Sequence, residues 1–491
     1  MNNENSVVRV GVENFEQLFA TAIWPLALDT YQRGFVWNKD KVRQLADDLV
    51  KYQEEVEKAS DYPDYYMGSI LIHEHADRTK QYIIDGQQRL TSLSVLYHNL
   101  CDRLPINFAL TYSSKSAEHI RQAANIYRTV TKPNAEIFNR ITFTVIRVKS
   151  VDLAFTFFDT QNNRGVPLHA TDLLKAYHLR EVGGFNAQHA ESLQKICAKR
   201  WEGIQQSSPV MSHDQEFTHS LFSKFLWRAR YWTGKRVYPV SHDALMQEFQ
   251  QETFKEKETA PDTIPLYRAH SNRLGASLAL TSSGYGEIRG STISLSPEAS
   301  TLPFSIRQPI HKGIGFFLYA DKYAALLHNL ISTPSTEPVI INFRKVYQDM
   351  ITANSLFLRE VFLLASLMYY DQFGHEKLWE FSLRLEQALG AIRIGKARVS
   401  YETAQKFIKD PELNFLDVIA NSYHPVQVID FLKRDLSNQA AYESETIETG
   451  KGVQGAYKQA VLAYFEKAPM NSLAQKNLWI DYKLKPENSK G

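Results

Sequence analysis

The chain has 491 residues, of which 44% are hydrophobic and 22% charged, so it is long enough for two or three soluble domains. A formal net charge of +2 excludes nucleic-acid binding driven by bulk charge and leaves only a local basic patch for that purpose. The chain has only two cysteines, Cys101 and Cys197, and no signal-peptide pattern, so we expect a cytoplasmic protein. No apolar run approaches the roughly 18 residues that span a bilayer, so we expect no membrane segment.

The first distinctive pattern is an amphipathic helix over residues 39–58, after a short strand at 7–10. Val42, Leu45 and Leu49 recur there at helical spacing with charges between them. Just before this helix lies an irregular polar loop, Tyr31-Gln32-Arg33-Gly34. Without further context Arg33 is more simply a surface arginine, and a ligand contact is the alternative.

Two strands and a helix follow, with a polar turn between the second strand and the helix. Residues 67–73 and 82–84 are β-favouring and suggest a hairpin, and leucines at helical spacing follow from Leu90. The turn between them is Asp85-Gly86-Gln87-Gln88-Arg89. A helix N-terminus suits an anion, Gly86 permits a close backbone approach, and Arg89 has the geometry to bind a phosphate. The alternative is that Asp85 caps the helix and the rest is a solvated turn.

A second turn of the same design comes later in the chain. A helical, basic stretch at 115–140 leads to the strongest strand, residues 141–148. An apolar run then precedes the turn Asn162-Asn163-Arg164-Gly165, and Thr171 is expected to cap a helix that contains Asp172. Two such turns in one domain favour a single pocket lined by both.

Beyond residue 180 the pattern becomes almost entirely helical. The sequence predicts a domain at 1–180 and a second, mostly helical one at 181–491, with a subdivision near the Ser-, Gly- and Pro-rich loop at 281–303. Residues 265–280 are included among the helical segments. Gly390 to Ala397 resembles a phosphate-binding P-loop, but it follows a helix and lacks the Ser or Thr that holds magnesium. We interpret it as a helix–helix linker.

Four motifs together resemble a known family. They are YQRGFVW at 31–37, MGSIL at 67–71, IIDGQQRLTSL at 83–93 and FFDTQNNRGVPLHATDLLKA at 157–176. In this order they resemble the N-terminal domain of GmrSD-type modification-dependent restriction enzymes, also found in SspE. The resemblance covers roughly the first 180 residues and implies an α+β chain: a ParB/sulfiredoxin-like α/β domain followed by a large helical domain.

The resemblance also implies that the first domain binds a nucleoside triphosphate with Mg²⁺ and hydrolyses it, coupled to recognition of modified phage DNA. The expected catalytic residues are Asp85, Gln87, Gln88 and Arg89, with Asp85 also as the magnesium ligand. The expected nucleotide-binding residues are Tyr31, Gln32, Arg33, Gly86, Thr91, Asn162, Asn163, Arg164, Gly165 and Asp172.

The chain departs from many members of this family because no C-terminal HNH nuclease motif can be found. The leading expectation is therefore an NTP-binding, NTP-hydrolysing component of a bacterial anti-phage system that acts on DNA. Its expected partner is a separate nuclease or another subunit of the system, and the chain could itself form a homo-oligomer. One alternative is a non-catalytic DNA-binding scaffold or sensor. Another is an autonomous nuclease, which the missing motif disfavours.

Overall fold

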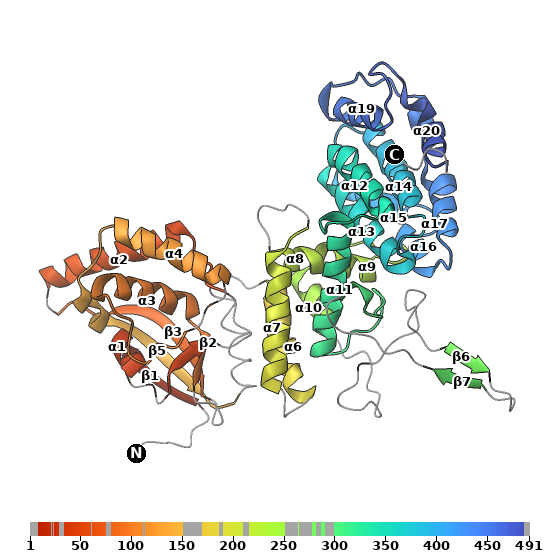
Figure 1. The fold of residues 1–491 in the computed structure, drawn as a ribbon. Helices are drawn as coiled ribbons and strands as arrows, with labels where there is room; N and C mark the ends of the chain where they lie inside the picture. The colour runs from red at the N-terminus through yellow and green to blue at the C-terminus, as the bar shows by residue number, and fades with distance from the viewer. Residues whose placement is uncertain are drawn as a thin grey trace. The chain divides into compact units, whose positions relative to one another are not determined.

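The computed structural model describes most of the chain, which divides into two compact units, Met1–Ala176 and Tyr177–Gly491. The described residues are 8–20, 22, 24–28, 34–59, 61–74, 80–110, 112, 114–150, 169–185, 190–209, 216–250, 264, 277–280, 286–289 and 299–485. The first unit runs from red to yellow in Figure 1, and the second from yellow to blue.

The first unit is built on a five-stranded mixed sheet with the strand order β1-β5-β3-β4-β2. The pairs β1–β5 and β3–β4 are antiparallel, whereas β3–β5 and β2–β4 are parallel. Its elements are β1 (Val8–Asn14), α1 (Phe15–Ala20), β2 (Leu26–Leu28), α2 (Lys39–Lys58), β3 (Tyr65–Glu74), β4 (Gln81–Asp85), α3 (Gln87–Cys101), α4 (Ser114–Thr129), the 3₁₀ helix η1 (Ala135–Arg140), β5 (Ile141–Val148) and the start of α6 (Ala170–Phe185).

One face of this sheet carries the core of the first unit. Alternate side chains of the central strands, such as Ile70, Ile72, Ile83 and Val145, are fully buried and share one cluster with side chains of α1 to α4. This alternation follows from the two-residue period of a strand. The helices α2, α3 and α4 lie together on one side of the sheet (Figure 1).

The second unit is mostly helical. Its helices are the rest of α6, α7 (Ala190–Gln206), α8 (Phe217–Ser220), the π-helix η3 (Leu221–Leu226), α9 (Trp227–Tyr231), α10 (His242–Gln250), η4 (Ala299–Thr301), α11 (Ile314–Ile331), α12 (Pro338–Asp349), η5 (Ile351–Ala353), α13 (Leu356–Phe373), α14 (Leu378–Gly395), α15 (Tyr401–Lys409), α16 (Phe415–Asn421), α17 (Pro425–Phe431), the π-helix η6 (Leu432–Leu436), α18 (Gln439–Glu443), α19 (Gly452–Tyr464), η7 (Leu473–Gln475) and α20 (Lys476–Lys483). A small antiparallel hairpin, β6 (Ser277–Leu280) and β7 (Gly286–Arg289), is inserted between α10 and η4.

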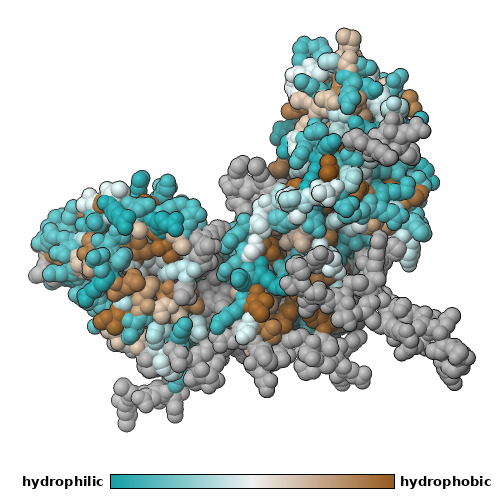
Figure 2. All heavy atoms as spheres, in the orientation of Figure 1, coloured by the Kyte–Doolittle hydropathy of each residue, from teal (hydrophilic) through white to brown (hydrophobic). Residues whose placement is uncertain are grey.

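The strongest sequence patterns are confirmed. The helix at Lys39–Lys58, the strand at Ile141–Val148 and the antiparallel pairing of β3 with β4 all form as expected. The class is α+β, with the sheet in the first unit and mostly helices after it. On the face drawn in Figure 2 hydrophilic side chains predominate over both units, with apolar ones scattered among them. Within the described residues, every helix is too short or too polar to cross a membrane.

Three local expectations were wrong. Ser277–Leu280 is a strand paired with Gly286–Arg289, because so short an apolar run fits a strand as well as a helix. The stretch from Gly390 to Gly395 is the last part of α14 and not a linker. Thr171 lies inside α6 and does not cap it; the Asp172 carboxylate instead accepts the backbone N–H of His169, at 3.3 Å.

Candidate functional site

The candidate site lies where β4 ends and α3 begins. Gly86 separates them with a left-handed φ of 95°, and a side chain there would also press on Ile70, whose Cγ1 lies 3.0 Å from the Cβ position. Only glycine suits this turn. The residue at the N-cap of α3, Gly86, has no side chain that could cap the helix. Because the first intrahelical bond is Leu90 N–H to the Gly86 carbonyl, the N–H groups of the three residues before Leu90 point out of the helix end.

The Arg89 side chain is engaged by the backbone of β3. Its guanidinium donates to the Met67 carbonyl at 2.9 Å and the Ser69 carbonyl at 2.7 Å, and it lies 3.3 Å from the Asp85 carboxylate. These carbonyls belong to an irregular part of β3, where its pairing with β5 shifts register between Tyr66 and Ser69. Arg89 therefore ties the first turn of α3 to the irregular part of β3.

Gly68, in the middle of that irregularity, makes the contact with Arg89 possible. Its φ is 100°, and a Cβ at this position would overlap Nη1 of Arg89. A larger residue would have to leave the left-handed conformation and also displace the guanidinium. Gly68 belongs to the MGSIL motif at 67–71, but nothing in the sequence pattern predicts this role.

Gln88 fastens the segment that follows the Tyr31-Gln32-Arg33 loop. Its side-chain carbonyl accepts the Val36 N–H and its amide donates to the Gly34 carbonyl, both at 2.9 Å. The Phe35 N–H donates to the Ser116 hydroxyl at 3.0 Å, so the segment is held from α4 as well. Both ends of the Gln88 amide are thus used to position the polypeptide backbone.

Gln87 differs from Gln88 and Arg89 because its side-chain amide nitrogen is buried and has no hydrogen-bond partner among the described residues. The residue is only 4% exposed. An unmade hydrogen bond at a buried polar group costs about 1–3 kcal/mol. The Gln87 amide is therefore an unsatisfied donor at the amino end of α3.

The other expected residues are placed as follows. The Thr91 hydroxyl is buried and lies 3.0 Å from the hydroxyl of Tyr112, and burial raises the pKa of that tyrosine. Asp172 is buried at the start of α6. The expected ligand residues Tyr31, Gln32, Arg33, Asn162, Asn163, Arg164 and Gly165 lie outside the described residues. Three of the four family motifs thus meet at the first turn of α3, through Gly34, Met67 and Arg89.

The fit to a triphosphate with magnesium is uneven. The free amide of Gln87 and the N–H groups of the helix end suit a phosphate. For the metal, Asp85 offers one carboxylate whose Oδ2 is paired with Arg89, and no group of three metal-ligating side chains occurs in the described ranges. Magnesium is nevertheless commonly held by one carboxylate together with substrate phosphates and water, so Asp85 suffices only if phosphates supply the remaining ligands.

Comparison with known families agrees with this description of the chain. Residues 15–179 match the GmrSD restriction endonuclease N-terminal domain, and residues 193–449, just over half of the chain, match a family of unknown function (DUF7834). The chain belongs to the DUF7834 family, and its first part is a GmrSD-type N-terminal domain. No curated protein matches it.

The GmrSD-type domain confirms the resemblance drawn from the four motifs, and its matched range contains the whole turn from Asp85 to Arg89. This domain family is named for a restriction endonuclease, so the chain is related to restriction and defence proteins. The two matches include no HNH nuclease domain.

Proposed function

We propose that the GmrSD-type domain binds a nucleoside triphosphate at the amino end of α3 and hydrolyses it. In this proposal the chain is the NTP-using component of a cytoplasmic restriction system that acts on DNA, and a separate protein supplies the nuclease. The observation that carries the proposal is the buried amide of Gln87, which has no partner among the described residues, beside the N–H groups that point out of the α3 N-terminus.

Each polar residue of the turn then has a distinct part. Gln87 and the backbone N–H groups bind phosphate oxygens, because an anion supplies the acceptor that the Gln87 amide lacks. Arg89 and Gln88 are positioning residues, since their side chains already hold the β3 backbone and the segment Gly34–Val36. Asp85 orients the attacking water or a magnesium ion, and magnesium would neutralise charge that develops on the phosphates.

A titration of the full chain with each of the four ribonucleoside triphosphates and Mg²⁺ tests this proposal. We expect Gln87→Met to keep its fold and to bind the preferred nucleotide at least tenfold more weakly, as a lost hydrogen bond to a charged group implies. Gln122→Met is the matched control, because Gln122 is exposed on α4 and the chemical change is the same. Turnover is followed by phosphate release.

The results separate the competing functions. Nucleotide binding and turnover unchanged in Gln87→Met would refute the assignment of this turn. Salt-dependent binding of modified DNA by the wild-type chain, without any turnover, would favour the scaffold or sensor function. Cleavage of plasmid DNA by the purified chain with magnesium would favour an autonomous nuclease.

A further inference from the structure

A second polar site lies in the first unit, at the opposite end of β4 from the α3 turn. It is a cavity of about 270 Å³, lined by Arg9, Val10, Gly11, Glu13, Glu74, Gln81 and Arg147. Gln81 begins β4 and Asp85 ends it, so the two sites are separated by about 13 Å along the strand. Four strands of the sheet contribute to the cavity, and the proposed phosphate-binding turn does not.

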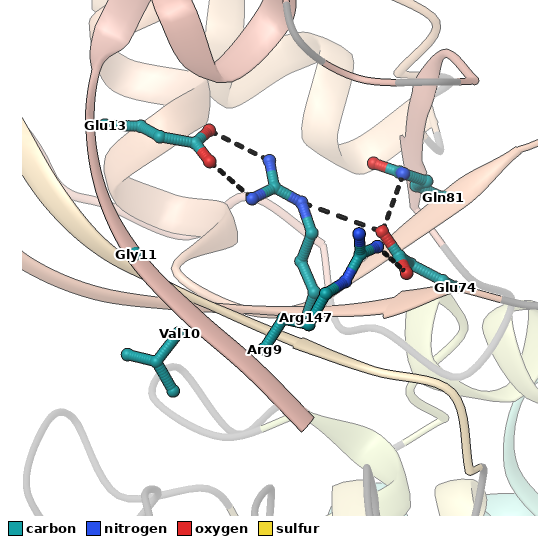
Figure 3. A pocket seen from close by; sticks show the side chains of 7 residues that line it. All are labelled: Arg9, Val10, Gly11, Glu13, Glu74, Gln81 and Arg147. Carbon is teal, nitrogen blue, oxygen red and sulfur yellow. Dashed lines mark hydrogen bonds and ion pairs between the residues drawn. The ribbon is translucent and has the colours of Figure 1, made fainter. Parts of the chain in front are cut away.

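The cavity occupies the polar end of the sheet face that carries the core. Along β3 the core residues Ile70 and Ile72 are followed on the same face by Glu74, and along β5 Val145 is followed by Arg147. Figure 3 shows the charged side chains converging over this face while Val10 points to the other side of β1. The charged positions thus continue the apolar alternation of the strands.

Gly11 leaves the space that forms the cavity. It lies between Arg9 and Glu13 on β1 and opposite Val145 on β5. A Cβ added to Gly11 would meet no atom within 4 Å. The space at this position is therefore open because glycine has no side chain and no neighbouring residue occupies it.

The charged groups of the cavity are held in fixed places by one another. The Arg147 guanidinium donates to both carboxylate oxygens of Glu13, at 2.5 and 2.9 Å. Glu74 pairs with Arg9 and accepts a hydrogen bond from the Gln81 amide at 3.1 Å. Two guanidinium groups and two carboxylates give the lining no net formal charge.

Gln81 and Glu74 form one wall of the cavity. Within the described residues the side-chain carbonyl of Gln81 has no hydrogen-bond partner, and it is buried too deeply for a ligand to reach. The Glu74 carboxylate, which accepts the hydrogen bond from the Gln81 amide, presents two adjacent acceptor oxygens on this wall. Arg9, whose side chain is 39% exposed, supplies N–H donors at the mouth.

This lining selects the chemistry of a ligand. The carboxylates repel a phosphate and the guanidinium groups repel a metal ion. A neutral ligand with two adjacent N–H donors beside an acceptor satisfies both walls, and the volume suits a group smaller than a typical bound drug or cofactor. Among nucleobases guanine has this edge, with N1–H and the 2-amino group as donors and O6 and N7 as acceptors that arginine prefers.

We propose that this cavity is a guanine-binding site, separate from the α3 turn. The N1–H and 2-amino groups donate to the two carboxylate oxygens of Glu74, and Arg9 donates to the O6 and N7 edge. The proposal depends on the lining of the cavity and not on NTP hydrolysis. The base comes either from a free nucleoside or nucleotide or from an unpaired base of a nucleic acid.

Guanosine binding to the full chain, measured by titration, tests the proposal. We expect guanosine to bind, inosine to bind at least fivefold more weakly because it lacks the 2-amino group, and Gly11→Leu to abolish binding by filling the cavity. Gly11 has ordinary strand backbone and open space, so this variant should fold. Arg9→Ala should weaken binding at least tenfold. Arg140→Ala is the control, because it removes another partly exposed arginine, paired with Asp64, just before the start of β5.

Further titrations distinguish the outcomes. No binding of guanosine or of a guanine-containing single-stranded oligonucleotide at millimolar concentration would overturn the proposal, as would equal binding by wild type and Gly11→Leu. Competition by the oligonucleotide alone would identify nucleic acid as the source of the base. Gln87→Met should bind guanosine normally. If guanosine binds as expected but Gln87→Met binds the nucleoside triphosphate as tightly as wild type, only the proposed function fails. If guanosine does not bind but Gln87→Met weakens binding of the nucleoside triphosphate, only the guanine site is refuted.

Discussion

His178 is an example of a polar side chain that the interior holds in one protonation state. Its Nδ1 accepts the Gly313 N–H at 3.2 Å, so its Nε2 carries the proton and donates to the Phe249 carbonyl at 2.9 Å. The ring also stacks on Phe316, with centroids 3.8 Å apart. Burial lowers the pKa of His178 to about 3. The imidazole is therefore neutral throughout the physiological range.

This burial predicts a pH-dependent stability. The unfolded histidine has a pKa of about 6.5 and takes up a proton as the pH falls, whereas the folded one does not until about pH 3. The His178 contribution is therefore fully present above about pH 7 and is lost progressively toward pH 3, by about 2 kcal/mol between pH 7 and pH 5.

Urea unfolding of wild type and of His178→Gln at pH 7 and pH 5 measures this effect. Glutamine keeps one donor and one acceptor but does not titrate. The loss of stability between the two pH values should be smaller in the variant by about 2 kcal/mol. Equal losses in both proteins would show that His178 is not the titrating group.

At the same scale, the sequence predicted where the polar turn lies but not what each side chain does. The pair Asp85-Gly86 follows a β-favouring run and precedes leucines at helical spacing, and this pattern was sufficient to predict the position of the turn. The different roles of Gln87 and Gln88 depend on Gly34 and Val36, which are distant in the chain and come close only in the folded domain. Likewise Glu74 and Arg147 each continue the alternation of their own strand. That they lie on the same face of the sheet becomes clear only when the strand order is known.

At the scale of elements, the irregular start of β3 connects strand geometry with the α3 turn. The left-handed Gly68 interrupts the pairing of β3 with β5, and the Arg89 guanidinium binds the carbonyls on either side. Periodic patterns predicted the helix at Lys39–Lys58 and the strand at Ile141–Val148. No periodicity marks such a break, because it arises from one residue's φ and one distant side chain.

Gly68→Ala should therefore destabilise the first unit by about 1–3 kcal/mol, through the positive φ and the displaced guanidinium. Gly11→Ala is the matched control, since it lies on a neighbouring part of the same sheet without positive φ or close atoms. It should be neutral or slightly stabilising. Denaturant unfolding compares the two. A Gly68→Ala protein as stable as Gly11→Ala would mean that the irregularity of β3 tolerates a side chain.

At the scale of the whole molecule, the second unit has its own buried polar centre. The Lys476 ammonium of α20 lies 2.6 Å from the Glu386 carboxylate of α14, and both side chains are fully buried. It also donates to the hydroxyls of Tyr442 and Tyr457, from α18 and α19. These hydroxyls occupy the space beside Gly390, where a Cβ would overlap them, so the glycine of the P-loop-like stretch is explained by packing.

This centre and the β3 irregularity lie in different units, which allows a test of whether the two units unfold independently. Lys476→Met leaves the Glu386 charge buried without its partner, at a cost of about 3–5 kcal/mol. Burial lowers the pKa of Lys476, and the charge and hydrogen bond of Glu386 oppose this shift, so the two groups depend on each other. We expect calorimetry of the full chain to resolve two transitions, one for each unit. Lys476→Met should lower only one transition, by on the order of 5 °C or more, and Gly68→Ala should lower only the other. If both variants shift the same transition, the units fold as one cooperative body.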